Sequence, residues 1–390
     1  MTTESQVKPP FWRDVRYIRV VAQVVGVAII AILVYVLWFN LTNNLRRQGI
    51  STNFDFLDRP GGVNIAGSDI SPGASVRRFL WLGIKNTFAL AVVGIPLLTI
   101  IGVLIGVARL STNWLVSKFA GFYVESLRNL PPLLIIFFAF FAVILNLPPP
   151  GDPATPLGLA VISNLRISVP WFESVGDEGA GAFWPIVGVL AVAAVGIWIW
   201  RTRVHTNTGA PHRRVLWSFG FLVVATLIVW LALGRPVRIS VPQADGRLVT
   251  GGVSGLGGYF AVLVALVLYT ASHVAEITRG SILAVPKGQT EAANALALSG
   301  FQRLRYVILP QAMRIGIPPV ISQYLNFVKN TSLAIAVGYA DLVLIAFQAI
   351  GNGYPAPQLI LLVMAGYLVF SLSISLIVNL LNRRLAIPST

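Results

Sequence analysis

The chain has 390 residues, of which 56% are hydrophobic and only 11% are charged, and its net charge is +15. About a quarter of the residues in soluble globular domains are charged, so this composition excludes a soluble globular protein. The absence of cysteine excludes disulfide frameworks and thiolate metal sites. The apolar residues form continuous runs, which favours spanning helices over the short alternating segments of a β-barrel.

Eight apolar runs are long enough to cross a bilayer, since a spanning helix needs about 20 residues. We therefore predict an all-α polytopic membrane protein with about eight transmembrane helices. In chain order the runs cover residues 20–39, 86–107, 120–147, 184–200, 216–234, 258–278, 313–350 and 357–381. The seventh run is too long for one span, and its proline pair (318–319) and KNTS sequence (329–332) predict a break.

The basic residues predict the orientation, because cytoplasmic loops of membrane proteins are enriched in Lys and Arg. With the N-terminus inside, the inner segments hold 18 of the 29 basic residues, the outer segments hold 10, and Lys329 lies in the membrane. Both termini, residues 1–19 and 382–390, are then expected in the cytoplasm. The positive charge therefore reflects membrane orientation, and no nucleic-acid partner is expected.

The segment between the sixth and seventh runs, residues 279–314, is too polar to span and is expected in the cytoplasm. Thr290 is predicted to cap a helix that has Glu291 in its first turn. Gly300 is expected to stop this helix, and Pro310 to end a second short helix. The pair is predicted to lie on the membrane surface, either as an interfacial amphipathic element or as a docking element.

Three sequence blocks around this segment carry a family resemblance. They are YVESLRNLPPLLIIFFAFF (123–141), HVAEITRGSILAVPKGQTEAANALALSG (273–300) and LPQAMRIGIPPVISQYLNFVKNTSLA (309–334). In this order they resemble the permease subunits of ABC importers, in particular the polar amino-acid branch (histidine, glutamine and arginine type). The whole chain is similar to the enlarged permeases of broad-range bacterial amino-acid importers.

The resemblance implies a division of the chain. A five-span core would consist of residues 86–147 and 258–381, with a cytoplasmic coupling loop at 279–314. The additions would be a first span with its outer loop, within residues 20–85, and an insertion with two further spans, 148–257.

The coupling loop is implied to dock on a cytoplasmic ATPase. The residues that match the family's loop are Gly288, Glu291, Ala292, Ala293, Ala297, Gly300, Leu309 and Pro310. Ala297 departs from the pattern, because the family usually has glycine six residues after the glutamate.

The function implied by the resemblance is ATP-driven import of amino acids, with this chain as half of the translocation path. The implied partners are an ATPase dimer, a second and related permease chain, an extracytoplasmic amino-acid-binding protein and the bilayer of a bacterial inner membrane. This chain has no G-x-x-x-x-G-K-[ST] motif, so ATP and magnesium are expected on the ATPase, and neither enzyme activity nor a cofactor is expected here.

The alternative function is an ion-coupled secondary amino-acid transporter. Such a protein would be expected to carry paired acids within the membrane, whereas only Glu276 and Asp341 approach it here.

Polar residues within the apolar runs are candidates for substrate contact, because they are costly in hydrocarbon. They cluster at the expected break of the seventh run: Asn326, Lys329, Asn330, Thr331 and Ser332. Lys329 could instead reach a membrane interface or pair with Asp341.

Two acid–base pairs have the i,i+3 spacing of neighbours on a helix. Glu276 with Arg279 and Glu125 with Arg128 are expected to form structural or gating ion pairs. No spacing indicates a metal site or a catalytic set.

Overall fold

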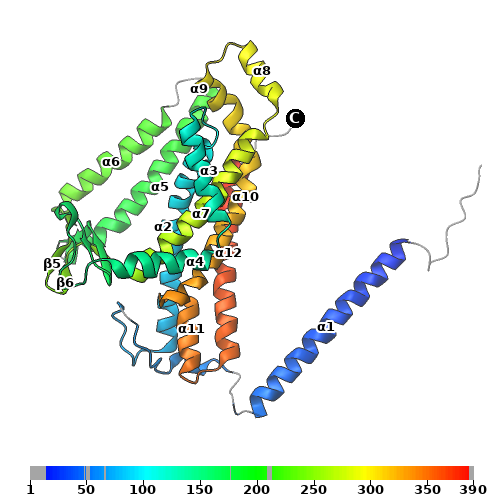
Figure 1. Ribbon diagram of the computed structural model, residues 1–390, viewed down its shortest axis with the longest axis vertical. Helices are drawn as coiled ribbons and strands as arrows, with labels where there is room; N and C mark the ends of the chain where they lie inside the picture. Colours follow the sequence, from blue (N-terminus) through cyan, green and yellow to red (C-terminus); the bar gives the residue numbers. More distant parts are fainter. Residues whose placement is uncertain are drawn as a thin grey trace, which may run out of the picture.

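The computed structural model describes residues 15–47, 49, 53–65, 67–175, 177–208 and 213–385 (Figure 1). Within these residues six helices are long and apolar enough to span a membrane, and two bent helix pairs raise the number of spans to as many as eight. The six helices are α1 (Val15–Arg47), α2 (Val76–Ala108), α5 (Asp177–Thr208), α6 (Arg214–Ala232), α7 (Gly257–Leu283) and α12 (Ala356–Leu385). The predicted helical membrane fold with about eight spans is confirmed.

The first bent pair covers the run expected at 120–147, but it is a sharply bent pair of helical segments and not one straight helix. α3 (Trp114–Arg128) meets the next helical segment at 105°. Pro131 and Pro132 lie at the corner, where the first disfavours helical backbone in the residue before it and the second begins the new helix. The new segment consists of α4 (Pro132–Phe137), a π-helical turn (Phe138–Val143) and a 3-10 turn (Ile144–Asn146).

The second bent pair has an angle of 46° between residues 300–337 and α11 (Leu342–Gly351). Its first arm consists of α9 (Gly300–Arg303), a π-helical turn (Leu304–Ile308), α10 (Leu309–Asn330) and a 3-10 helix (Thr331–Val337). The chain turns at Gly338, which has a φ of 70° in the left-handed region that favours glycine. The break therefore follows KNTS, as expected, but Pro318 and Pro319 lie inside α10 and do not break it.

α2 and α7 form the largest helix–helix contact of the described residues, and α10 packs against α7. The core of this bundle includes the fully buried Leu90, Leu98, Leu266 and Phe327. Glycines allow the close approach of α2. A Cβ atom at Gly106 would lie only 2.6 Å from the backbone oxygen of Ala275 on α7.

Seven short strands lie beside the bundle, at the ends of α5 and α6 that are remote from α8 (Lys287–Ala295) and α9 (Figure 1). They are β1 (Val161–Ile162), β2 (Arg166–Val169), β3 (Trp171–Ser174), β4 (Val237–Ser240), β5 (Gln243–Asp245), β6 (Leu248–Thr250) and β7 (Val253–Leu256). β1, β2 and β7 form one antiparallel sheet, while β3–β4 and β5–β6 are antiparallel pairs. We call this the strand end. Short 3-10 turns occur at Asp55–Asp58 and Pro156–Gly158.

α8 and α9 lie at one end of the bundle, away from the strands and opposite α11, and we call this the α8 end (Figure 1). α5 and α6 form a hairpin beside the bundle, and their main helix contact is with each other. α1 lies away from the other helices, and the most apolar window of this helix has no buried residue.

Candidate functional site

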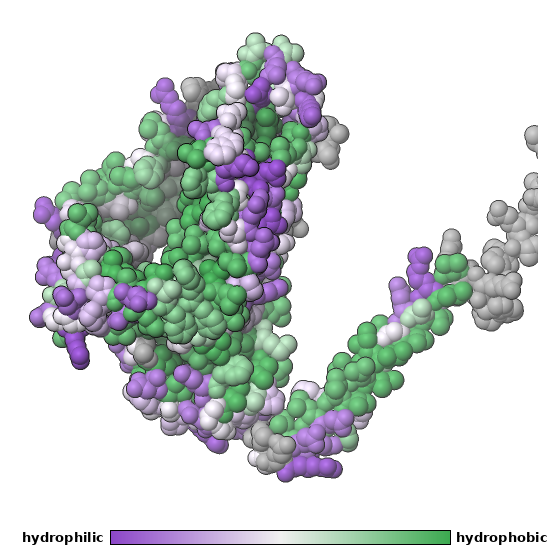
Figure 2. Space-filling model, viewed as in Figure 1, coloured by the Kyte–Doolittle hydropathy of each residue, from purple (hydrophilic) through white to green (hydrophobic). Residues whose placement is uncertain are grey.

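One face of α10 carries exposed polar side chains along the length of the helix. Arg314, Ser322, Asn326 and Lys329 are exposed and follow one another at intervals of eight, four and three residues, which places them on one helical face. The opposite face contacts the core through the fully buried Phe327 and Val328. Figure 2 shows a hydrophilic band along this part of the surface, between apolar surfaces. We call the four residues the polar stripe.

The five residues proposed from the sequence for substrate contact do not form one cluster. Asn326 and Lys329 lie on the polar stripe, and Asn330 is half-buried beside it. Thr331 is fully buried, and its hydroxyl donates to the backbone oxygen of Val328 at 2.7 Å. The Ser332 hydroxyl donates to the backbone oxygen of Lys329 at 2.8 Å.

Two members of the stripe, Arg314 and Ser322, were missed from the sequence. The residues of KNTS are consecutive in the sequence, and only some of them can share one helical face. The signal that could have found the other two is the recurrence of polar residues at helical spacing back from Lys329 through the whole of α10.

Asp341 is buried between the 3-10 helix and α11, and its partners are not lysines. One carboxylate oxygen caps α11 by accepting from the backbone nitrogen of Leu344 at 2.8 Å, and the other accepts from the Tyr367 hydroxyl at 3.1 Å. The suggested Lys329–Asp341 pair is therefore wrong. Lys329 forms no salt bridge within the described part of the chain.

A cluster of ion pairs joins α2, α3 and α7 near the α8 end. Glu276 on α7 pairs with Arg279 at 3.1 Å and with Arg128 on α3 at 3.6 Å, and it also bonds Arg109 at the end of α2. The Arg109 side chain is only 14% exposed and that of Glu276 29% exposed. One carboxylate therefore holds three arginines from three helices.

The expected Glu125–Arg128 pair is not present among the described salt bridges. Arg128 faces Glu276, and the 75% exposed Glu125 side chain has only a 3.9 Å contact with Arg109. The i,i+3 rule finds neighbours on one helix, whereas the partner of Arg128 lies on another helix. Arg109 was missed because it lies 167 residues from Glu276 in the sequence.

α8 begins earlier than the sequence analysis expects. Its N-cap is Pro286, so Thr290 lies inside the helix and the predicted Thr290 cap is wrong. Pro286 lacks an N–H group and has a fixed φ, which makes it suitable just before a helix. Glu291 consequently lies beyond the first turn, where the helix dipole contributes less to it than expected.

The turn after α8 is formed at Ala297 rather than Gly300. The backbone nitrogen of Leu298 bonds the oxygen of Ala293 at 3.1 Å, and that of Ala297 bonds the oxygen of Asn294 at 2.9 Å, the pattern of a Schellman turn. Ala297 has a φ of 52°, a left-handed conformation usually given to glycine. The left-handed turn therefore lies at Ala297, the position where the family usually has glycine.

Gly300 starts the next helix instead of ending α8, so the predicted stop at Gly300 is wrong. Ser299 caps α9 through a capping box with Gln302. The predicted end of the second helix at Pro310 is also wrong, because Pro310 lies in the first turn of α10, where a missing N–H is tolerated.

The surface of α8 is largely open. Gly288, Glu291 and Ala292 are exposed, while Ala293 is buried against the rest of the chain. Two apolar side chains at the α8–α9 corner are also uncovered: Leu296 is 75% exposed and Phe301 68%. Leu309 and Pro310 are half-buried at the start of α10.

Two side-chain hydrogen bonds brace this corner. Gln311 on α10 donates to Gln289 at 3.0 Å, and Arg303 on α9 donates to Asn294 at 2.5 Å. The result is a short, fixed helix that projects from the bundle.

Comparisons with known proteins agree with this architecture. Residues 214–387 match the family described as binding-protein-dependent transport system inner membrane component. The general L-amino acid transport system permease protein AapQ of Rhizobium johnstonii is 37% identical over 96% of this chain and 94% of its own length. The chain belongs to this family of ABC-transporter permeases.

Two other relatives of this permease differ in how much of it they match. The glutamate/glutamine/aspartate/asparagine transport system permease protein BztB of Rhodobacter capsulatus is 34% identical over 95% of this chain and 94% of its own length. The glutamine transport system permease protein GlnP of Escherichia coli is 37% identical, but over 42% of this chain and 75% of its own length. None of these comparisons favours an ion-coupled secondary transporter.

The polar stripe of this permease carries positive charge and no negative charge. Its four residues supply two cations, an amide and a hydroxyl, and no carboxylate. Such a face favours an anionic group of a small molecule, while a cationic group must find its partners elsewhere.

Proposed function

We propose that this permease is one of two membrane-spanning subunits of an ATP-driven bacterial importer of amino acids. The substrate class rests on the relatives, whose names describe general L-amino acid, glutamate/glutamine/aspartate/asparagine and glutamine transport. The α8 end is the cytoplasmic side, and both termini lie on that side. The strand end meets an extracytoplasmic amino-acid-binding protein.

The observation that carries this proposal is the polar stripe of α10. A charged side chain in the hydrocarbon of a bilayer costs several kcal/mol, so such residues face a protein or a water-filled cavity. Arg314, Asn326 and Lys329 are exposed on this chain. A second, related permease therefore covers this face, and the substrate passes between the two stripes.

α8 couples this path to an ATPase dimer, which binds ATP and magnesium. The support is geometric: α8 projects from the bundle, presents Glu291, and is flanked by the uncovered Leu296 and Phe301. Exposed apolar side chains beside a charged group are typical of a docking site, where the apolar groups supply affinity and the charge supplies specificity.

The division of the chain follows from the same proposal. The core consists of α2, the α3–α4 pair, the pair from α9 to α11, α7 and α12, which makes five spans. α1 with its following loop and the segment 148–257 are additions. The two spans of this second addition, α5 and α6, form an even number and leave the orientation of later helices unchanged.

Cysteine variants test the path directly, because the natural chain has no cysteine. Ser322→Cys and Asn326→Cys are expected to react with a charged, membrane-impermeant thiol reagent in proteoliposomes, and the reaction should block amino-acid uptake. Leu372→Cys is the control, since Leu372 is 59% exposed on the apolar surface of α12 and should face lipid. If the cysteines at positions 322 and 326 are as unreactive as the control, the polar stripe does not line the translocation path.

Glu291→Gln tests the coupling role. Truncating one partner of a buried charge pair costs about 2–5 kcal/mol, which corresponds to a loss of ATPase affinity of about 30-fold or more. The measurements are ATPase co-purification and binding-protein-stimulated ATP hydrolysis. Arg203→Gln, which removes an exposed charge on α5 at the same end, should leave both unchanged. If Glu291→Gln behaves like this control, the carboxylate does not contribute to docking.

A further inference from the structure

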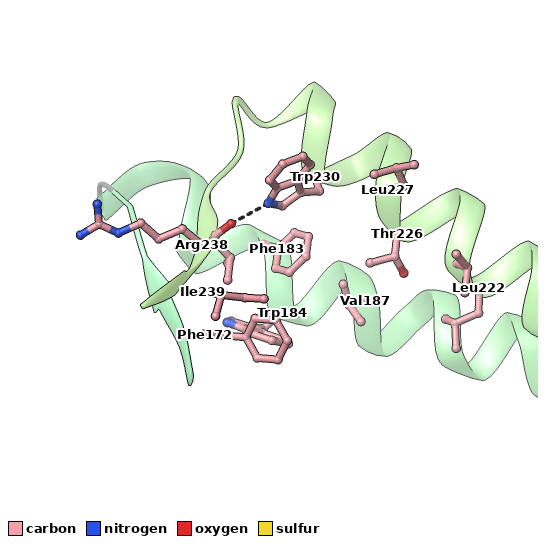
Figure 3. Close-up of a pocket in the computed structure, with 12 residues that line it drawn as sticks. Phe172, Phe183, Trp184, Val187, Leu222, Thr226, Leu227, Trp230, Arg238 and Ile239 are labelled. Atoms are coloured by element: carbon pink, nitrogen blue, oxygen red, sulfur yellow. Dashed lines mark hydrogen bonds between the residues drawn. The ribbon is translucent and has the colours of Figure 1, made fainter. Parts of the chain in front are cut away.

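A cavity of about 510 Å³ lies at the strand end of the α5–α6 hairpin, outside the polar stripe and α8. Its walls come from both helices and from β3 and β4, as Figure 3 shows. Most of the lining residues are aromatic or aliphatic, among them Phe172, Phe183, Trp184, Leu227, Trp230 and Ile239. This volume falls within the range of small-molecule sites, about 300–1,000 Å³.

Two polar groups at the cavity already have partners. The indole nitrogen of Trp230 donates to the backbone oxygen of Val237 at 2.6 Å. The guanidinium of Arg238 points out of the cavity in Figure 3 and pairs with Glu173 at 3.1 Å. Hydrogen bonds from Ser240 and Arg238 hold the pKa of the Glu173 carboxyl below its usual range, so this pair stays charged.

An amino acid does not fit these walls. Its ammonium and carboxylate groups would lose their hydration, and Thr226 supplies the one lining hydroxyl, so most of that loss would be uncompensated. The lining selects a ligand with a long apolar part.

The place of the cavity indicates where such a ligand comes from. Trp184 lies near the start of α5 and Trp230 near the end of α6, and tryptophans at the ends of spans lie at the depth of lipid headgroups. The cavity therefore opens at the boundary between headgroups and acyl chains. Phospholipids are the most abundant molecules at this depth.

A cationic side chain, Arg235, lies beside Trp230 at the edge of the cavity. Arg235 is exposed, its guanidinium lies 5.6 Å from the centre of the Trp230 ring, and it forms no salt bridge within the described residues. We propose that the cavity binds one acyl chain of a phospholipid from the leaflet at the strand end, with Arg235 contacting its phosphate. The hairpin then carries a specific lipid in addition to the general lipid around the protein.

Photo-crosslinking tests this proposal on the full-length protein purified with its co-expressed partners. The probe is a phosphatidylglycerol with a diazirine on one acyl chain, added after detergent removal of native lipid and mapped by peptide mass spectrometry. Labels are expected to concentrate on residues 183–187 and 222–230. Val187→Trp and Thr226→Phe, which fill the cavity from α5 and α6, should each abolish this concentration.

Val192→Trp is the matched control, because Val192 is 73% exposed on α5 and does not line the cavity. It should leave the labelling pattern unchanged, and an unaltered melting temperature shows that the two filled variants are folded. Arg235→Gln should weaken labelling by phosphatidylglycerol but not by a diazirine diacylglycerol, which has no phosphate.

Three outcomes would overturn the proposal. Uniform labelling along α5 and α6 that Val187→Trp does not change would mean general lipid contact only. Labelling of the isolated chain but not of the assembled complex would mean that a partner protein fills the cavity. Equal labelling by a diazirine fatty acid and by phosphatidylglycerol, with no effect of Arg235→Gln, would exclude a phospholipid site.

Discussion

The α2–α7 contact and the α5–α6 hairpin are both built from strongly apolar helices, but these helices pack very differently. The most apolar windows of α5 and α6 have mean hydropathies of 2.2 and 2.3, yet only 11% and 6% of these windows are buried. The corresponding window of α7 is less apolar, at 1.8, and 61% of it is buried. Hydropathy therefore does not decide which span lies in the centre of this protein.

Both regions contain glycines, but only those of α2 lie at a close helix contact. On α2, a Cβ atom at Gly102 would lie 2.7 Å from the Cβ of Val274, so the helices approach through a small-xxx-small pattern formed by Gly102 and Gly106. In the hairpin, Gly188, Gly196 and Gly220 have no atom within 4 Å of the position of a Cβ. Because lipid is as apolar as leucine, close van der Waals packing drives helix association in membranes, and apolarity alone does not.

The largest effect is expected from a substitution that disrupts the α2–α7 contact. Gly102→Leu places a branched side chain against Val274 and the backbone oxygen of Ala271, and overpacking of this kind costs about 1–3 kcal/mol or more. We expect a lowered melting temperature of the purified complex and loss of uptake.

Gly220→Leu in α6 is the matched control, since the same change meets open space there. It should leave the melting temperature unchanged. If both variants lose the same stability, close packing does not distinguish the two regions.

A smaller effect is expected from the ion pairs that hold the bundle at the α8 end. Glu276→Gln leaves Arg109, Arg128 and Arg279 near one another without their shared carboxylate. Hydrogen bonds to charged groups contribute about 1.5–3 kcal/mol when buried, and partial exposure lowers this to about 1–2 kcal/mol here. The melting temperature of the variant, measured at low and at high salt, checks the expectation.

Glu125→Gln removes a carboxylate from the same neighbourhood. Its side chain is 75% exposed and its contact with Arg109 is long, at 3.9 Å, so its loss should cost less than about 1 kcal/mol. Equal destabilisation by the two variants would contradict the central place of Glu276.

The smallest effect on the bundle is expected from removal of the hairpin. Ser174 and Val237 are opposite each other in the β3–β4 pair, so an Asn-Gly turn can replace residues 175–236 and join the strands directly. The shortened chain should insert, keep its orientation and melt near the natural temperature, because an even number of spans is lost together with few contacts to the bundle.

Protease protection of the termini and the melting temperature check the shortened chain. A misfolded product would show that the hairpin contributes to folding of the bundle. The same variant lacks the cavity, so the concentrated lipid labelling should disappear with it.

The site was predictable where chemistry depends on local sequence and not where it depends on contacts between helices. Asn326 and Lys329 stand out as polar residues in an apolar run, and both lie on the exposed face of α10. Thr331 stands out equally, but it turns inward because consecutive helical residues point about 100° apart. Arg109 contacts Glu276 although the two residues are 167 positions apart in the sequence. Helical spacing cannot reveal such a contact.

The sequence by itself determined that this is a helical membrane protein, where its apolar runs lie, and which family it belongs to, because hydrophobic length and linked motifs are properties of the chain. It also marked Ala297 as a departure from the family pattern. Only the tertiary structure decided that Ala297 adopts the left-handed turn, that the chain turns at Asn129–Pro131 and Gly338, and which of the apolar helices form the core. The physical reason is that burial in a membrane follows the fit between helices, and fit depends on residues that are far apart in the sequence.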